Sequence, residues 1–350
     1  MLGWIVFAIA STVYLMTMEP TASFWDCGEF ISSAYKLEVG HPPGAPFFML
    51  TANLFTQLAS DPSTVAKMVN TMSALFSGLT ILFLFWSITH LARKIMVKDG
   101  EEASLGQMIT VMGSGLVGAL AYTFSDTFWF SAVEGEVYAY SSLFTAVVFW
   151  LILKWEAVAD KPHADRWIVL IAYLMGLSIG VHLLNLLCIP AIVLVYYYKK
   201  FPNPTMKGTL VALLASFAIV ALMMYGVVQG LVEVCGYFEL LFVNVLGMPY
   251  NSGVFAYVII VAGVLIWSIW ETMRDEIHPT RMKIAFILSV VLIGIPFIGS
   301  GYVLAVILTA ALSLYLFKSK KVDIKTLNTI LVCLMVVVVG YSSYALTLIR

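Results

Sequence analysis

Charged residues are scarce in this chain of 350 residues. Asp, Glu, Lys and Arg make up 11% of it, whereas a soluble globular protein carries about 25%. The mean hydropathy is +0.96, and 61% of the residues are hydrophobic. These values exclude a soluble enzyme, a disordered chain and a nucleic-acid-binding protein with a basic face. The net charge of −1 implies no bulk electrostatic partner, so the sequence is that of an integral membrane protein.

Cysteine is also rare and widely spaced. The four cysteines are Cys27, Cys188, Cys235 and Cys333. No Cys-x-x-Cys pair is present, so the sequence has neither a disulfide framework nor a zinc signature. A P-loop is missing as well. The one match to a dinucleotide-binding pattern, residues 113–118, falls in the middle of an apolar segment, where small residues favour helix packing.

Long apolar runs are what the sequence does have. A membrane-spanning helix needs about 17 to 25 predominantly apolar residues. The runs that meet or approach this length are residues 2–18, 68–92, 107–124, 137–153, 167–181, 183–198, 208–230, 254–270, 284–299, 301–317 and 327–349. The first run lacks the basic region and the cleavage site of a signal peptide, so it is interpreted as a span. The sequence therefore predicts an all-α integral membrane protein, a bundle of about 11 transmembrane helices.

The basic residues predict the orientation of these spans, because cytoplasmic loops carry an excess of Lys and Arg. With the N-terminus inside, 16 of the 19 basic residues fall in inner loops. The outer side then holds Lys36, Lys67 and Arg350. This asymmetry predicts an odd number of spans, with the N-terminus inside and the C-terminus outside. The inner loops show no pattern beyond solvation, whereas the outer loops hold the unusual motifs.

The longest outer loop, residues 19–67, contains a carboxylate pair. Asp26 and Glu29 are three apart, which places them on one face of a helix that begins near residue 23. Two carboxylates at an apolar boundary suit a general base, a metal site or the binding of sugar hydroxyls. The alternative is a helix cap plus a solvated acid. In the same loop His41 opens a rigid His-Pro-Pro-Gly turn, which either aims the imidazole or simply returns the chain to the membrane.

The other outer loops hold two further polar groups. Glu134 and Glu136 stand where the fourth span begins, beside Tyr138. Acids at a helix N-terminus complement its dipole, so these two are either caps or site residues. His182 and Asn185 lie three apart in an apolar run. They either line a polar cavity or hydrogen-bond a neighbouring helix.

A ligand with a phosphate needs a cation, and the outer side offers few. Lys36 lies on the predicted loop helix, and Arg350 ends the last span. Arginine suits a phosphate through its planar fork, although Arg350 also has the position of an ordinary snorkelling residue. With acids only and no His-rich cluster, we expect no metal.

The order of motifs in the first outer loop resembles a known family. Asp26 is followed by a mildly amphipathic helix through Tyr35 and Leu37 and then by the turn that begins at His41. Protein O-mannosyltransferases have an acidic pair, a short helix and a His-Pro-Pro turn at similar spacing. A bacterial protein-O-mannosyltransferase-like membrane family, related to an animal O-mannosyltransferase of plexin-type receptors, is more similar still. The strings that look like that family are residues 19–30, 40–46, 134–138, 180–185 and 341–350.

This resemblance implies a GT-C fold over residues 1–350, with a catalytic loop at 19–67 and the active site on the outer face. It also implies an outer C-terminal domain, which we expect this chain to lack. The implied reaction moves a sugar, mannose by the family's name, from a polyprenyl-phosphate donor to a Ser or Thr hydroxyl of an acceptor protein, with inversion at the anomeric carbon.

The resemblance also assigns roles to residues. Asp26 matches the catalytic acid, which acts as the base on the acceptor hydroxyl, and His41 matches the His-Pro-Pro turn. In the mannosyltransferases a Glu directly follows the Asp. Here Cys27 follows it and Glu29 comes three positions later, so both carboxylates are candidates for the base. The expected donor- and acceptor-binding residues are Lys36, His41, Glu134, Glu136, Tyr138, His182, Asn185 and Arg350.

No cofactor is expected, because the lipid-linked sugar is a substrate. The expected partners are the donor lipid, an acceptor protein and the membrane, with a further subunit possible and no nucleic acid. The expected location is a bacterial inner membrane with the active face periplasmic. Two alternatives stay open. A lipid-linked-sugar flippase would show charges and broken helices at mid-span depth, and a non-catalytic assembly subunit would tolerate the loss of both Asp26 and Glu29.

Overall fold

The computed structural model describes residues 1–98, 100–298, 302–319 and 323–345. Regular structure in this part of the chain is entirely helical, with no β-strand. The chain forms two compact units. The first comprises Met1–Val195 with Gly340–Thr347, and the second comprises Tyr196–Val339 with Leu348–Arg350. The candidate site lies in the first unit.

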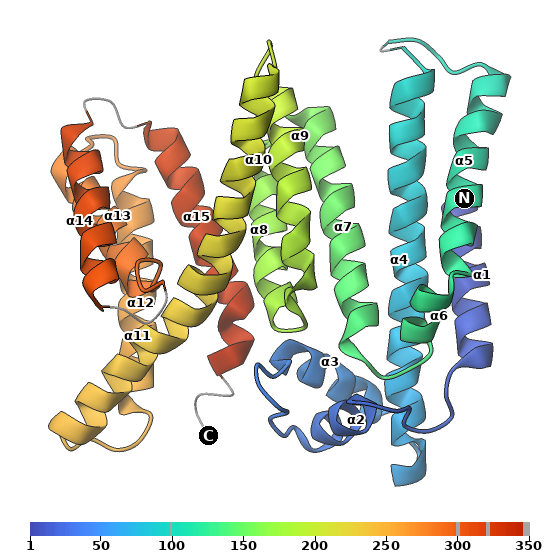
Figure 1. The fold of residues 1–350 in the computed structure, drawn as a ribbon, viewed down its shortest axis with the longest axis horizontal. Helices are drawn as coiled ribbons and strands as arrows, with labels where there is room; N and C mark the ends of the chain where they lie inside the picture. Colours follow the sequence, from blue (N-terminus) through green and yellow to red (C-terminus); the bar gives the residue numbers. More distant parts are fainter. Residues whose placement is uncertain (99, 299–301, 320–322, 346–350) are drawn as a thin grey trace. The chain divides into compact units, whose positions relative to one another are not determined.

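Two long helices form the centre of the first unit. They are α4 (Val65–Met96) and α7 (Val137–Val158), which pack against each other and run in the same direction (Figure 1). Helices α1 (Leu2–Thr17) and α5 (Leu105–Thr123) pack on α4, and α8 (Arg166–Ile179) packs on α7. Consequently the N-terminal ends of α4 and α7 share one end of the unit, and their C-terminal ends share the other.

Polar caps set the ends of these helices. The Asp61 carboxylate accepts from the Ser63 N–H at 2.8 Å, at the start of the short turn η1 (Pro62–Thr64) that leads into α4. Ser104 opens α5 with a capping box, in which its backbone N–H donates to the Gln107 side-chain oxygen at 2.9 Å. Basic residues in the last turn of α4 complement the helix dipole. The chain between the caps is apolar, which is why the helices are long.

Two short helices lie across the N-terminal ends of α4 and α7 (Figure 1). Helix α2 (Cys27–Lys36) is the loop helix predicted from the sequence, but it begins at Cys27 and not near residue 23, so Asp26 precedes it. Helix α3 (Pro46–Thr56) is not predicted, because its 11 residues are too few to span a membrane. Proline at its first position favours a helix start. Helices α2, α3, α4 and α7 bury a common apolar core, which includes Phe30, Phe48, Met72, Tyr140 and Phe144.

Hydrogen bonds attach this pair of helices to the bundle. The Asn53 side-chain amide donates to the Ala34 carbonyl at 2.8 Å, which ties α3 to α2. The buried Asn70 of α4 donates to the Glu19 carbonyl at 2.7 Å and to the Thr21 carbonyl at 3.0 Å. The loop is therefore held at its start and in its middle, so it forms a fixed floor for a site.

The second unit contains one long helical run and four shorter helices. The run joins α10 (Met206–Ala221), η3 (Leu222–Val228), α11 (Gln229–Leu240) and η4 (Leu241–Val245). It is followed by α12 (Ser252–Glu271), α13 (Pro279–Leu292), α14 (Tyr302–Lys318) and α15 (Ile324–Tyr341). The remaining elements of the chain are α6 (Asp126–Ala132), η2 (Leu183–Cys188), α9 (Ile189–Lys200) and η5 (Ser342–Tyr344).

The helices confirm the predicted class. Every one of the predicted spans coincides with helix in the described residues. There, 7 helical runs are long and apolar enough to cross a membrane, so the total of 11 and the orientation stay predictions.

One predicted boundary is wrong. The run that starts at Met206 continues to Val245, well beyond residue 230. Its acids are bonded within the fold, because Glu239 accepts from the Gly253 N–H at 2.9 Å and from the Val254 N–H at 3.1 Å.

Candidate functional site

Asp26 stands at the N-cap position of α2, but its side chain does not cap the helix. Among the described residues, its carboxylate accepts no hydrogen bond. The preceding residue, Trp25, adopts a left-handed backbone conformation with φ of 63°, which is uncommon for a bulky residue. Such strain persists only where the surrounding structure imposes it. Asp26 is therefore an exposed carboxylate at a tightly constrained corner of the chain.

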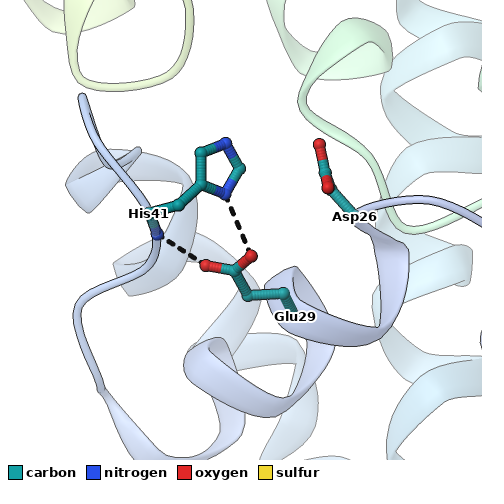
Figure 2. A group of neighbouring side chains, drawn as sticks. All are labelled: Asp26, Glu29 and His41. Atoms are coloured by element: carbon teal, nitrogen blue, oxygen red, sulfur yellow. Dashed lines mark hydrogen bonds and ion pairs between the residues drawn. The ribbon is translucent and has the colours of Figure 1, made fainter.

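Glu29 is held on the same side of α2 by His41. The His41 backbone N–H donates to Oε1 of Glu29 at 2.5 Å, and Nδ1 of the ring lies 2.9 Å from Oε2 (Figure 2). These bonds lower the pKa of Glu29 below its usual value. The same side-chain hydrogen bond, followed by the charge of Glu29, raises the pKa of His41. The pair thus favours a carboxylate facing an imidazolium.

The turn that carries His41 is fixed from two sides. Within it, the Gly44 N–H donates to the His41 carbonyl at 2.7 Å, and Gly44 has a φ of 70° that suits glycine. The Tyr344 hydroxyl donates to the Gly44 carbonyl at 3.1 Å. Just after the turn, the Phe47 N–H donates to the Gly180 carbonyl at 2.8 Å. The imidazole is therefore aimed by a turn that the rest of the unit holds in place.

Glu134 and Glu136 are buried beside the start of α7. The Glu136 carboxylate accepts from the Val137 N–H at 3.0 Å, yet burial raises the pKa of Glu136 to about 7. Burial also raises the pKa of Glu134, against hydrogen bonds from Ser23 and Cys27 that lower it. Both acids therefore hold protons more tightly than exposed glutamates, and Glu136 changes charge near neutral pH.

Cys27 directly follows Asp26 in the chain. Its side chain is buried, and the thiol hydrogen-bonds to Glu134. Burial raises the pKa of the Cys27 thiol to about 12, so it stays protonated. Cys27 therefore points into the protein and supports Glu134, while Glu29, two residues later, lies near Asp26.

These acids meet at one cavity of about 630 Å³. Its carboxylates are Asp26, Asp126, Glu134 and Glu136, and its aromatic residues are Phe24, Trp25, Phe130 and Tyr138. Thr127 and Ser131 complete the lining. The Phe24 and Trp25 side chains are 87% and 90% exposed. Aromatic rings can pack on the apolar face of a sugar through dispersion contacts, and carboxylates can accept from its hydroxyls.

The remaining predicted site residues lie in different places. The His182 ring centroid is 5.3 Å from that of Tyr138, and His182 Nδ1 accepts from the Leu184 N–H at 3.1 Å. Asn185 is buried and donates to the Ser178 hydroxyl at 3.0 Å; it is not among the residues that line the cavity. Lys36 is exposed in the last turn of α2. Arg350 lies outside the described residues.

Three side chains of the described part of the chain are close enough to hold a metal ion together. They are Asp26, Glu29 and His41, whose candidate ligand atoms lie within 4.8 Å of one another. Figure 2 shows the Asp26 carboxylate across from the bonded pair. In the structure both oxygens of Glu29 are within hydrogen-bond distance of His41, through its backbone N–H and its Nδ1.

Several cavity residues were not predicted. Asp126, Thr127, Phe130 and Ser131 belong to α6, a helix of 7 residues whose length lies below what hydropathy detects. The available signal was a run of three aromatic residues, 128–130, with a polar residue on each side. Phe24 and Trp25 were not predicted as site residues either.

A family model and two individual proteins that match this chain carry the same description. The family described as the protein O-mannosyl-transferase TMEM260 N-terminal domain matches residues 26–205. The protein O-mannosyl-transferase TMEM260 of Mus musculus is 28% identical over 174 residues, which are 50% of this chain and 22% of the mouse protein. The Dictyostelium discoideum protein O-mannosyl-transferase tmem260 is 25% identical over 187 residues, 52% of this chain and 21% of that protein.

The matched part covers about a fifth of each of these relatives. The family match over residues 26–205 contains all the carboxylates that line the cavity, together with Glu29 and His41. No solved structure matches the chain.

Proposed function

This chain belongs to the family of the protein O-mannosyl-transferase TMEM260 N-terminal domain, and we propose that it is the catalytic membrane part of a protein glycosyltransferase. The donor is a sugar, mannose by the family's name, carried on a polyprenyl phosphate. The acceptor is a Ser or Thr hydroxyl of a protein. The enzyme is of the GT-C class and acts on the outer face of a bacterial inner membrane.

The observation that carries the proposal is the state of Asp26. Of the two candidate bases, Glu29 has both oxygens bonded to His41, whereas the Asp26 side chain makes no hydrogen bond in the described structure and lines the cavity. A general base must reach the proton that it removes. Asp26 meets this requirement, and Glu29 would first have to give up His41.

The reaction then proceeds by direct displacement. Asp26 accepts the proton of the acceptor hydroxyl as its oxygen attacks the anomeric carbon. The bond between that carbon and the phosphate oxygen breaks, and the polyprenyl phosphate leaves with the electron pair, which inverts the anomeric configuration. A base and a stabilised leaving group are both needed, because charge develops at both oxygens in the transition state.

His41 is the cation that we assign to the leaving phosphate. Its Nδ1 is bonded to Glu29, so its Nε2 remains to donate to a phosphate oxygen. Glu29 raises the pKa of His41 and so favours the charged ring. Lys36, at the far end of α2, is a poorer candidate, since a helix of this length separates it from Asp26 by about 15 Å. This scheme needs no metal and no cofactor.

The distribution of charge supports an enzyme over a flippase. Asp26, Glu134 and Glu136 gather at one cavity, and Glu29 and His41 adjoin Asp26. All belong to the loops at the N-terminal ends of α4 and α7. A flippase would instead place charges along the middle of its spans.

The test is sugar transfer in membranes that contain the wild-type protein or the Asp26→Asn variant. Radiolabelled polyprenyl-phosphate mannose is supplied, and label in protein is counted. We expect Asp26→Asn to lower transfer by about 10²- to 10⁴-fold, the range that a general base contributes. Glu38→Gln is the matched control, because Glu38 is an exposed carboxylate of the same loop that does not line the cavity.

Each outcome of this test is informative when protein abundance is equal. Loss of sugar transfer in Asp26→Asn, with normal transfer in Glu38→Gln, supports the proposal. Equal transfer by Asp26→Asn and wild type contradicts the role of Asp26. No transfer by the wild type with any lipid-linked sugar contradicts the enzymatic function itself and favours the flippase or the assembly subunit.

A further inference from the structure

A second cavity lies at the opposite end of the first unit. It encloses about 480 Å³ and is bounded by the C-terminal ends of α4 and α7 and the N-terminal half of α5. Helix α7 runs from Glu136 at the first cavity to Lys154 at the second, about 27 Å along its axis. The two cavities therefore belong to opposite faces of the membrane.

The second cavity is basic where the first is acidic. Arg93, Lys154 and His90 line it, and no carboxylate is among the described residues that do. The nearby Glu156 is already paired with Lys94, and the linker residues Glu101 and Glu102 are not among those that line the cavity. Arg93 has no ion pair within the described structure. Arg93 and Lys154 thus face a common space that no carboxylate of the described residues lines.

Aromatic side chains form one wall of this cavity. The ring centroids of Trp86 and Trp150 are 5.6 Å apart, and the Lys154 ammonium lies 4.9 Å from the Trp150 ring centroid. Tryptophan is enriched at the level of lipid headgroups, where its ring is apolar and its N–H is wet. The contact with Trp150 holds the Lys154 charge near the cavity rather than free in solvent.

Apolar side chains of α5 form another wall, on the side that faces the lipid hydrocarbon. Met108, Val111 and Met112 of α5 line the cavity, and the outward face of the same helix exposes Ile109 at 64% and Val117 at 70%. A helix this apolar and this exposed contacts lipid in a membrane-spanning protein. The cavity is therefore open to acyl chains along α5 and charged at its headgroup end.

We propose that this cavity binds the phosphate of an anionic phospholipid. Arg93 and Lys154 would contact the phosphate, Trp86 and Trp150 would contact the glycerol, and the acyl chains would run along α5. Basic pockets between helices on the cytoplasmic side bind anionic headgroups in this way, and the guanidinium fork of Arg93 suits a phosphate. A lipid is favoured over a free phosphate because the cavity joins an apolar face. The proposal does not depend on the glycosyltransferase function.

The test is the thermal stability of the full chain in detergent, with added lipid. Phosphatidylglycerol and phosphatidylcholine of the same acyl chains are compared with inorganic phosphate, and native mass spectrometry counts the bound lipid. A lipid that binds only the folded protein stabilises it by mass action. We expect phosphatidylglycerol to raise the melting temperature by about 2–5 °C more than phosphatidylcholine does.

Three double variants test the position of the binding site. Arg93→Gln with Lys154→Gln should lose most of the added stabilisation and the bound phosphatidylglycerol. Lys161→Gln with Arg166→Gln removes the same charge from the linker between α7 and α8 and from the first residue of α8, and should keep both the stabilisation and the bound lipid. The charge-keeping pair Arg93→Lys with Lys154→Arg should keep the bound lipid but change the affinity for phosphatidylglycerol. If the first variant does not fold, this change in affinity is the test of position.

Three results would overturn the proposal. The first is equal stabilisation by both lipids. The second is an equal loss of stabilisation in the variant with Lys161→Gln and Arg166→Gln, or no loss of stabilisation in the variant with Arg93→Gln and Lys154→Gln. The third is full stabilisation by inorganic phosphate alone, which would make the ligand a soluble anion.

Discussion

Both oxygens of the Glu29 carboxylate accept hydrogen bonds from His41, one from its backbone N–H at 2.5 Å and one from its ring at 2.9 Å. A carboxylate bound in this way is poorly suited to take a proton from a substrate, but it is well suited to orient and charge an imidazole. Glu29 is thus a positioning residue for His41, and Asp26 is left as the proposed base.

This arrangement predicts the behaviour of Glu29→Gln. The neutral amide cannot favour the imidazolium, and one of its atoms is a donor that faces a donor. We expect transfer to fall by about 10- to 100-fold, as for the loss of a charged hydrogen bond. The pKa of His41 falls towards its usual value. The activity that depends on charged His41, which is lost as pH rises through this pKa, should therefore be lost at a lower pH than in the wild type.

The measurement is the pH profile of sugar transfer, with Glu38→Gln as the matched control. An unshifted profile in Glu29→Gln would remove the proposed link between Glu29 and the charge of His41.

Glu29 should also make the free energy of unfolding depend on pH in the acid range. Because folding lowers the pKa of Glu29, its contribution is present above the usual value and is lost as pH falls through the folded value.

Glu136 predicts the opposite dependence of stability on pH. Its pKa rises from 4.5 to about 7 on burial, so the folded state binds the proton more tightly than the unfolded state does. The folded state therefore loses stability as pH rises from about 4.5 to about 7, by up to roughly 3 kcal/mol. In Glu136→Gln this part of the dependence should vanish.

Thermal unfolding of wild type and Glu136→Gln in detergent between pH 4.5 and pH 8 measures this effect. Glu38→Gln should keep the wild-type slope. Parallel curves for Glu136→Gln and wild type would show that Glu136 does not change its charge in this range.

Loss of the Trp25 side chain should weaken substrate binding without slowing the chemical step. Its side chain is 90% exposed, so Trp25→Ala should change the free energy of unfolding by no more than about 0.5 kcal/mol. Its loss removes a ring from the cavity wall, and we expect KM for the sugar donor or the acceptor to rise by about 10-fold, while kcat changes little. Steady-state kinetics in detergent measures both. Tyr250→Ala, an equally exposed aromatic of the second unit, is the control, and unchanged KM values in both variants would exclude Trp25 from substrate binding.

The charge distribution predicts which residues face each side of the membrane. A cysteine placed at Glu38 should react with an impermeant maleimide from outside, and a cysteine at Lys98 should react only after permeabilisation. Both positions are exposed, whereas Cys27, Cys188 and Cys235 of the parent protein are buried. The reverse pattern of labelling would invert the predicted orientation and move the proposed active face to the cytoplasm.

The spans and the loop helix were predictable from the sequence because they depend on local pattern. Hydropathy marks the apolar runs, and α2 has a polar start and an amphipathic face. Helix α3 is about as short as α2 but lacks its amphipathic pattern and is too short to span a membrane, so it was missed, as was helix α6 with its 7 residues. The extension of the seventh span to Val245 was missed because an acid such as Glu239 is typical of a loop. The sequence does not show that Glu239 accepts hydrogen bonds from the start of α12.

The different roles of Asp26, the proposed base, and Glu29, the partner of His41, were not predictable. Both are carboxylates near one end of α2, and only the path of the His-Pro-Pro-Gly turn decides which of them meets His41. The basic cavity was missed for a related reason. Arg93 and Lys154 are 61 residues apart, and in the sequence each is an ordinary basic residue at the end of an apolar run.

The hydroxyl of Tyr344 reaches the carbonyl of Gly44, which is 300 residues away in the chain. A ribosome adds about 5–20 residues per second, so about 15–60 s separate the synthesis of these two partners. Throughout that interval a nascent chain already carries Asp26, Glu29 and His41, but its His-Pro-Pro-Gly turn has no contact from η5. The turn is thus secured only after Tyr344 has been synthesised, and a chain that stalls before this residue leaves the turn without that hydrogen bond.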